Sequence, residues 1–590
     1  MKREKIILFT KYFAIFLWLS LLIETDSYYS IYLMLGVLSI VSITKNKNQG
    51  KKSSHSKLSY LFAGLFSLAT TLANYSLFSR MAESGGLHIV TAILASVLTF
   101  ASGIIVFKNV LLVTRNFSIK TSKKLTDSPR KVFLICFLIF SLIDLLVLFL
   151  CCYPGSLTPD SIDEIGQILS GSYSNHHPFY YTILIYPFIQ LGTNVFHDIN
   201  IGVAFFNVFQ ILILSAAFAY SISTLFHIGV SKKVLFILTV VLAILPYNII
   251  FSFTVWKDVM FAALFLIFIV TLYRYFYDLR LFEKSKIPQL TLLFFSGLTV
   301  CLLRSNALIA IVVSIIIFFI IFRKHYVKLG IILIVIIASA FILKRPVLSL
   351  IGVTQTDTIE SLSIPSQQIA RTIKYKYNKI SEEDINLINN LADSKELAEA
   401  YTPTISDPVK NTVRKYNNQK YIKEHAVDLI MLYLKLGTQH PVQYLTAWIE
   451  QTKGYWNGGY MSSVWANEVQ DNNYGLKRSG NTFMNKLFGG YLEIYRSTTF
   501  LQSFISIGLL VWLLFILLYR SVIDKNKINL FLITPILTTW ATLLIATPVY
   551  SELRYIYFAF TTIPFLIIIT FTRPPKQLSL TNEKKPNEKR

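Results

Sequence analysis

The feature that most constrains this chain is a succession of apolar blocks of about 17–25 residues, the length that crosses about 30 Å of hydrocarbon as a helix. The block 132–153 is typical, because its one charged residue is Asp144. Only 15% of the 590 residues are charged, against about 25% in soluble domains. We expect an all-α polytopic membrane protein of about 14 transmembrane helices, at 6–23, 28–44, 58–78, 87–113, 132–153, 199–226, 233–252, 258–277, 287–303, 306–322, 326–343, 503–520, 528–548 and 553–571.

The formal net charge of +24 is concentrated in short connections between apolar blocks, such as 115–131 and 274–286, and in the tail 573–590. Short basic loops beside apolar spans mark the cytoplasmic side of a membrane. The charge therefore reflects topology and does not predict a nucleic-acid partner. We expect a multi-pass protein of the cell membrane with its N- and C-termini in the cytoplasm.

The apolar stretch 179–196 does not fit as a crossing. Counting it as one would place Lys232 and Lys233 outside and would invert every later span. We therefore predict an amphipathic or re-entrant helix at the outer interface, where its flanks, His176-His-Pro178 and His197-Asp198, suit the headgroup region.

These assignments divide the chain into five parts. A four-helix membrane region with a basic cytoplasmic linker is expected at 1–130, and a second membrane module at 131–343, with its first outer loop at 154–198. A mainly helical extracytoplasmic segment follows at 344–502, in which Ser462 should be reachable from outside. The last three membrane helices occupy 503–572, and a basic cytoplasmic tail occupies 573–590.

Acidic residues gather in the first outer loop. Asp160 follows Pro159, which holds the preceding backbone extended, and a short helix is expected over 161–169. Asp160 either caps this helix or accepts a proton from an incoming hydroxyl group. Asp163 and Glu164 lie three and four residues later on roughly the same helical face. They are candidates for a second acid or a metal ligand, although a solvated face is the simplest interpretation.

Other outer turns carry groups that should reach the depth of Asp160. Lys257, Arg304 and Arg554 are candidates for binding a donor phosphate, because ammonium and guanidinium groups bind phosphate strongly. Arg304 and Arg554 could equally pair with Asp258 or Glu552 and hold helices together. We expect a shared polar cleft that also contains His176, His177, Trp256, Asp258, Asn306, Glu552 and Tyr555.

Two of these motifs carry a family resemblance. The run Pro154-Gly-Ser-Leu-Thr-Pro-Asp160, followed by His176-His-Pro178-Phe-Tyr-Tyr-Thr182, resembles the GT-C superfamily of membrane glycosyltransferases. In that superfamily an acidic motif in the first outer loop precedes juxtamembrane helices. The chain is more closely similar to an incompletely characterised group of large polytopic proteins from Gram-positive bacteria, which share the Pro-Gly…Asp, His-His-Pro, Trp-Lys-Asp and Glu-x-Arg-Tyr elements. The resemblance covers about residues 131–571.

The resemblance implies a GT-C-type hexosyltransferase of the cell envelope. It would move a sugar from a polyprenyl-phosphate donor to a cell-surface glycan, teichoic acid, lipid or protein acceptor on the extracytoplasmic face. Asp160 would be the general base, and 131–343 the catalytic module with 179–196 as a juxtamembrane helix. The acidic cluster reads Asp-Ser-Ile-Asp-Glu rather than a tight acidic pair, so the sequence leaves open whether a divalent cation takes part; no other cofactor is expected.

Two other classes of protein share this architecture. A polysaccharide polymerase or ligase also has many spans and one large outer loop, but we would expect its site to be built from arginines in that loop. A lipid-linked glycan flippase or transporter would show internal repeats and charges at mid-membrane depth. Here such charges are few, Lys11 and Asp144 being examples, and the polar groups cluster at the span ends.

Overall fold

The computed structural model describes residues 2–23, 29–48, 57–83, 85–119, 121, 128–280, 287–322, 326–417, 419–459 and 468–572. The regular structure of these residues is entirely helical, with isolated β-bridges but no named strand. The predicted all-α class is therefore confirmed. The predicted basic tail at 573–590 and Ser462 lie outside the described residues.

Eight of the described helices are long and apolar enough to cross a membrane, and ten spans result if each of two bent pairs counts as one. The eight are α5 (Leu87–Asn116), α6 (Pro129–Cys151), α9 (Ile199–His227), α12 (Lys257–Arg280), α14 (Ser305–Phe322), α15 (Val327–Ile342, with its apolar span continuing to Leu350), α27 (Lys527–Ala546) and α28 (Leu553–Phe571). The protein is therefore a polytopic helical membrane protein.

The two bent pairs are α3 (Lys57–Ala73) with α4 (Tyr75–Ala82), at 51°, and α10 (Lys232–Ile244) with α11 (Pro246–Ser252), at 60°. Pro246 explains the second bend, because proline removes a backbone donor and keeps the preceding residue out of the helical conformation. Shorter apolar stretches lie in four further helices: α1 (Lys2–Ile23), α2 (Tyr29–Asn48), α13 (Ile287–Leu303) and α26 (Ile507–Ile523).

The connections between these helices gather at two ends of the bundle. At one end, which we call the inner end, Ile119 pairs with Thr572 and Thr121 with Val230. At the other, the outer end, Tyr153 pairs with Ser479, and residues 174 and 405 form bridges to 354 and 549. Residues 119, 121, 230 and 572, from connections predicted to lie on the cytoplasmic side, thus meet one another, and so do residues from four of the connections predicted to lie outside.

Two shorter helices, α7 (Pro159–Ser170) and α8 (Phe179–Asn194), lie between α6 and α9. Near the start of α8, the Tyr180 hydroxyl donates to the carbonyl of Leu343 at 2.7 Å. Beyond its end, the backbone N–H of Lys477 donates to Asn200 Oδ1 at 3.0 Å. Both partners belong to the outer end, so α8 returns without crossing the bundle. This agrees with the interpretation of 179–196 from its flanking charges.

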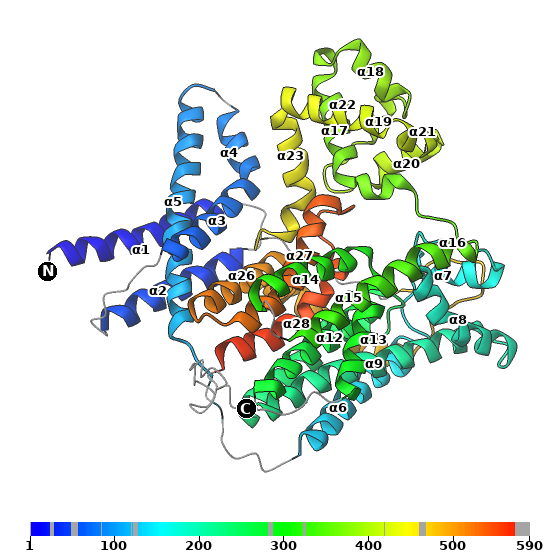
Figure 1. The fold of residues 1–590 in the computed structure, drawn as a ribbon. Helices are drawn as coiled ribbons and strands as arrows, with labels where there is room; N and C mark the ends of the chain where they lie inside the picture. Colours follow the sequence, from blue (N-terminus) through cyan, green and yellow to red (C-terminus); the bar gives the residue numbers. More distant parts are fainter. Residues whose placement is uncertain are drawn as a thin grey trace, which may run out of the picture.

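Residues 359–444, within the outer segment 344–502, form a helical lobe beyond the outer end, around their own apolar core that includes Ile373, Leu397, Val413 and Leu436. Phe488 and Leu492, later in this segment, pack instead into the core of the membrane bundle. Figure 1 shows this lobe above the long helices, with α7 and α8 at the edge of the bundle far from the N-terminal helices. The helices of the outer segment are α16 (Leu348–Leu350), α17 (Ser363–Lys376), α18 (Glu382–Asn389), α19 (Ser394–Ala400), α20 (Asp407–Lys415), α21 (Gln419–Glu424), α22 (Ala426–Gln439), α23 (Pro441–Thr452), α24 (Thr482–Ser497) and α25 (Thr499–Gln502).

The N-terminal helices share a core with the C-terminal helix α26. Phe66 and Phe107 stack at a centroid distance of 4.2 Å, and Trp512 of α26 meets both rings edge-on. The same helices reach the outer segment, where the Tyr75 hydroxyl donates to Glu450 at 2.5 Å and the Tyr32 hydroxyl donates to Asn457 at 3.0 Å. The first four spans are therefore built into the rest of the molecule.

Candidate active site

Asp160 lies in the first turn of α7, but it does not cap the helix. Thr158 is the N-cap residue and Pro159 occupies the first helical position, where its missing N–H costs nothing. The Thr158 backbone N–H donates to Ser161 Oγ at 3.1 Å, and this hydroxyl donates to the carbonyl of Val255 at 2.7 Å. The interpretation of Asp160 as the N-cap is therefore wrong, and the carboxylate of Asp160 is left for other partners.

Two buried amides of α9 fix the loop that leads to Asp160. Asn207 donates to the carbonyl of Pro154 at 2.8 Å, and Gln210 donates to the carbonyl of Thr254 at 2.8 Å. Gly155, with φ of 130°, lies so close to Asn207 that a Cβ atom would overlap its amide. Neither amide was predicted from the sequence. Their one signal is two amides a helical turn apart inside an apolar span, where an unpaired polar group would be costly.

Asp160 is surrounded by three groups from separate parts of the chain. Arg554, at the start of α28, donates to Asp160 Oδ2 at 2.8 Å. Lys257, at the start of α12, places Nζ 3.8 Å from the same oxygen, and His177 Nδ1 lies 4.0 Å from it. Lys257 Nζ and His177 Nδ1 are 3.1 Å apart. Four residues predicted for the cleft thus meet at one point of the outer end.

The charges around Asp160 determine its protonation state. Burial alone would raise the pKa of Asp160, but the positive charges of Arg554 and Lys257 outweigh it and hold this pKa well below its usual value. Burial and the charge of Lys257 lower the pKa of His177 to about 3. At neutral pH the site therefore holds an ionised carboxylate, two cations and a neutral imidazole.

The two other acids of α7 have different environments. The Asp163 side chain is 69% exposed and lies 3.8 Å from His177 Nε2. Glu164 is 1% exposed, and its Oε2 has no hydrogen-bond partner among the described residues. Burial raises the pKa of Glu164 well above its usual value, although Lys257 opposes the shift. A solvated face therefore describes Asp163, but it is wrong for Glu164, because α7 packs that side against the bundle.

Arg304 and Asp258 form a buried ion pair beside the Asp160 cluster. Arg304 Nε lies 2.8 Å from Asp258 Oδ1, and Arg304 also donates to the carbonyl of Tyr555 at 2.8 Å. These contacts connect α12, α28 and the α13–α14 turn. Asn306 turns away from this pair and donates to Thr542 of α27 at 3.2 Å. Of the two interpretations of Arg304, the structure has the ion pair, and Asn306 likewise joins helices.

Aromatic rings enclose Arg554. Its guanidinium carbon lies 5.1 Å from the Trp256 ring centroid and 5.0 Å from that of Tyr555, distances typical of cation–π contacts. The Trp256 indole donates to Thr158 Oγ1 at 2.7 Å. Glu552 lies 3.9 Å from Arg554 Nε, and burial raises the pKa of Glu552. The Arg554 guanidinium is thus held in place by two aromatic rings, and Glu552 offsets its positive charge only weakly.

Exposure separates the groups that solvent can reach from those that are buried in the fold. The side chains of Asp160, Lys257 and Arg554 are 27%, 17% and 18% exposed, whereas that of Asp258 is 2% exposed. The His176 side chain is exposed beside the cluster, and the loss of water on its protein-facing side, together with the charges of Arg414 and Lys257, lowers its pKa. Arg414 belongs to α20, so the outer lobe contributes to the electrostatics at His176.

A metal-binding arrangement was left open by the acidic motif. Among the residues that the structure describes, no group of three or more His, Cys, Asp or Glu side chains could hold a metal ion. Asp163 and Glu164 diverge, one facing solvent and the other the interior. The divalent cation therefore stays a prediction that the geometry of these two residues does not strengthen.

Comparison with known proteins gives a family. The family model for DUF6020, described as a family of unknown function, matches residues 170–585. The chain belongs to this family. The range matched by the DUF6020 model contains His177, Lys257 and Arg554 but begins at the last residue of α7, after Asp160. No curated protein and no solved structure matches the chain.

Proposed function

We propose that this protein is a membrane glycosyltransferase of the GT-C type, which moves a sugar from a polyprenyl-phosphate donor to an acceptor at the extracytoplasmic face. One observation carries the proposal: a partly exposed carboxylate, Asp160, lies 2.8 Å from Arg554 and 3.8 Å from Lys257 at the outer end of the bundle. Glycosyl transfer needs one base for the acceptor hydroxyl and cations for the departing phosphate. This cluster supplies both.

Each residue has a separate role in the proposed reaction. The acceptor hydroxyl oxygen bonds to the anomeric carbon of the sugar, and the bond from that carbon to the phosphate oxygen breaks. Asp160 takes the hydroxyl proton. Arg554 and Lys257 stabilise the negative charge that grows on the departing lipid phosphate, and the Trp256 ring 5.1 Å from the Arg554 guanidinium keeps that group oriented.

The contacts of Asp160 also suggest how donor binding prepares the base. In the free protein, Arg554 and Lys257 hold the pKa of Asp160 well below its usual value, after more than offsetting its burial. A carboxylate of such low pKa is a weak proton acceptor. A donor phosphate that takes over Arg554 and Lys257 neutralises their charges, so the pKa of Asp160 rises when the substrate is bound.

The test compares two carboxylates of the same helix. Asp160→Asn should lower donor cleavage at least about 100-fold, the usual size of a general-base contribution, while expression and membrane insertion are unchanged. Asp163→Asn makes the same change three residues away, on a side chain that is 69% exposed, and should keep most of the activity. Purified protein is given a panel of polyprenyl-phosphate hexoses, and release of polyprenyl phosphate is measured.

Two results would contradict the proposal. Wild-type turnover in Asp160→Asn would remove Asp160 from the reaction. Absence of cleavage by wild type with every donor of the panel, also after acceptor lipids and glycans are added, would end the glycosyltransferase assignment.

The proposed function requires a defined topology. We propose fourteen crossings with both termini in the cytoplasm, supported by the separation of basic inner loops from the outer loops that carry Asp160. The four cysteines Cys136, Cys151, Cys152 and Cys301 are buried, so new cysteines can be labelled against a low background.

Labelling tests the two ends separately. A cysteine at exposed Lys395 in α19 should react with an impermeant maleimide on intact cells, whereas one at exposed Lys525, between α26 and α27, should react only after lysis. The reverse pattern would overturn the topology and would place Asp160 on the cytoplasmic side.

A further inference from the structure

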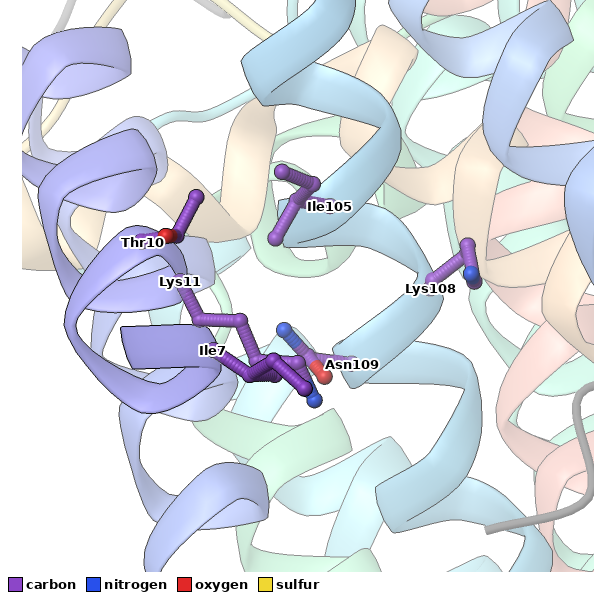
Figure 2. A pocket seen from close by; sticks show the side chains of 6 residues that line it. All are labelled: Ile7, Thr10, Lys11, Ile105, Lys108 and Asn109. Atoms are coloured by element: carbon purple, nitrogen blue, oxygen red, sulfur yellow. The ribbon is translucent and has the colours of Figure 1, made fainter. Parts of the chain in front are cut away.

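A cavity that contains two lysines lies between α1 and α5, on the side of the bundle opposite α7 in Figure 1. It has a volume of about 210 Å³. Figure 2 shows Lys11 extending from α1 toward Asn109 of α5, while Lys108 projects from the other edge of the α5 ribbon. The residues that line the cavity are Ile7, Thr10, Lys11, Ile105, Lys108 and Asn109.

The lining follows the same pattern on both helices. On α1 the three residues are spaced i, i+3 and i+4, and the same spacing recurs on α5. Residues with this spacing lie on one broad helical face, on which Asn109 faces Lys11 and Lys108 lies at the far edge, in contact with the Tyr60 ring. The two helices thus build the cavity together, and neither forms it alone.

Both lysines lie at similar distances from one end of their helices. Lys11 is nine residues after the start of α1 at Lys2, and Lys108 is eight residues before the end of α5 at Asn116. At a rise of about 1.5 Å per residue, each is roughly 12–14 Å from that end, which the proposed topology assigns to the cytoplasmic side. Lysine side chains at such positions extend toward the headgroup layer, where lipid phosphates lie.

The two positive charges have no carboxylate partner in the described part of the chain. No described Asp or Glu oxygen lies within 4.0 Å of either ammonium group. Lys108 instead places Nζ 3.4 Å from the centroid of the Tyr60 ring, and Asn109 donates to Ser39 at 3.1 Å. A charge kept inside a membrane helix is costly unless it is paired or functional. An anion from outside the chain would complete this cavity.

We infer that this cavity binds the phosphate group of a membrane lipid in the inner leaflet. Lys11 and Lys108 contact the phosphate oxygens, and the amide of Asn109 lies between them. Ile7 is 50% exposed beside the cavity and offers an apolar contact to the lipid chain. The same chemistry is presented by an anionic phospholipid and by a polyprenyl phosphate. This inference does not depend on the chemistry of Asp160.

Native mass spectrometry of the full-length protein in detergent tests the inference. Phosphatidylglycerol, undecaprenyl phosphate, zwitterionic phosphatidylcholine and inorganic phosphate are added separately. Wild type should retain one molecule of phosphatidylglycerol or undecaprenyl phosphate in preference to phosphatidylcholine, and whichever binds more tightly identifies the lipid. Lys11→Gln combined with Lys108→Gln should weaken that binding by about tenfold or more, since each surface lysine contributes about 1 kcal/mol to anionic-lipid binding.

Lys328→Gln is the matched control, because it removes one exposed lysine near the inner end, at the start of α15, away from the cavity. It should bind like wild type. If the double variant folds poorly, each single variant is measured instead, with an expected loss of a few-fold. Equal retention of phosphatidylcholine, unchanged binding in the lysine variants, or displacement of the lipid by equimolar inorganic phosphate would each overturn the inference.

Discussion

Replacing Arg304 with glutamine should destabilise the fold rather than weaken donor binding. Arg304 Nε lies 2.8 Å from Asp258 Oδ1, with side chains that are 10% and 2% exposed. At this distance the gross Coulomb attraction is on the order of 6 kcal/mol for an effective dielectric constant of about 20. Removal of one partner leaves the other charge buried, which costs about 3–5 kcal/mol.

Thermal unfolding in detergent, followed by intrinsic fluorescence, gives the size of this effect. Arg304→Gln and Asp258→Asn should each lower the midpoint by roughly 2–4 °C, because the unfolding entropy of a 590-residue chain is large, whereas the double variant should lose less than the sum of the two. A coupling of about 0.5–3 kcal/mol is usual for residues in contact. Arg345→Gln, which removes an exposed arginine, should leave the midpoint unchanged.

The opposite pattern would refute this reasoning. An Arg304→Gln protein with a wild-type melting midpoint and a raised KM for the donor would make Arg304 a phosphate-binding residue. Additive single variants would show that the pair is not coupled, despite its short distance.

Four further outcomes follow from the site. Gln210→Leu removes the hydrogen bonds to the carbonyls of Phe251, Ser252 and Thr254. The free energy of unfolding should fall by about 1–3 kcal/mol, and donor cleavage should become slower. An unchanged unfolding midpoint would contradict this expectation. Burial and the charge of Lys257 lower the pKa of His177 from its usual 6.5 to about 3. The unfolded chain therefore binds more protons, and stability should fall as the pH is lowered from 6.5 to 3, by up to roughly 1.4 kcal/mol per pH unit. His177→Gln should show a shallower decline in midpoint. Burial raises the pKa of Glu164 above its usual value of 4.5, so wild type should lose stability as pH rises above about 4.5, and the stability of Glu164→Gln relative to wild type should increase over the same range. The acidic limb of kcat should lie at higher pH than that of kcat/KM, because donor binding releases Asp160 from its cations; coincident limbs would oppose that coupling.

The sequence predicted the fold class well, because the physical rule behind it is simple. A span of apolar residues must satisfy its backbone internally, and loop charge indicates its direction. The same parity argument separated α8 from the crossing helices. The sequence could not predict the size of the 60° bend between α10 and α11. Pro246 indicates that the helix breaks, but packing against α6 and α9 sets the angle.

The sequence predicted which residues form the candidate site better than it predicted what each of them does there. Asp160, Lys257 and Arg554 stood out as charges at span ends, and they do meet. Burial cannot be read from spacing, so Glu164 was taken for a solvated residue, although packing of α7 buries it. The partner of Arg304 was one of two alternatives, because pair formation depends on how α12 and α13 lie against each other.

The aromatic contact between α26 and the N-terminal helices has a practical consequence. A chain trimmed to begin at residue 131 would leave Trp512 and Tyr519 without the rings of Phe66 and Phe62, and Glu450 without the Tyr75 hydroxyl. A shortened protein would then expose an aromatic surface on α26 and would tend to aggregate. Anyone simplifying this protein should keep all four N-terminal spans, or resurface α26 before removing them.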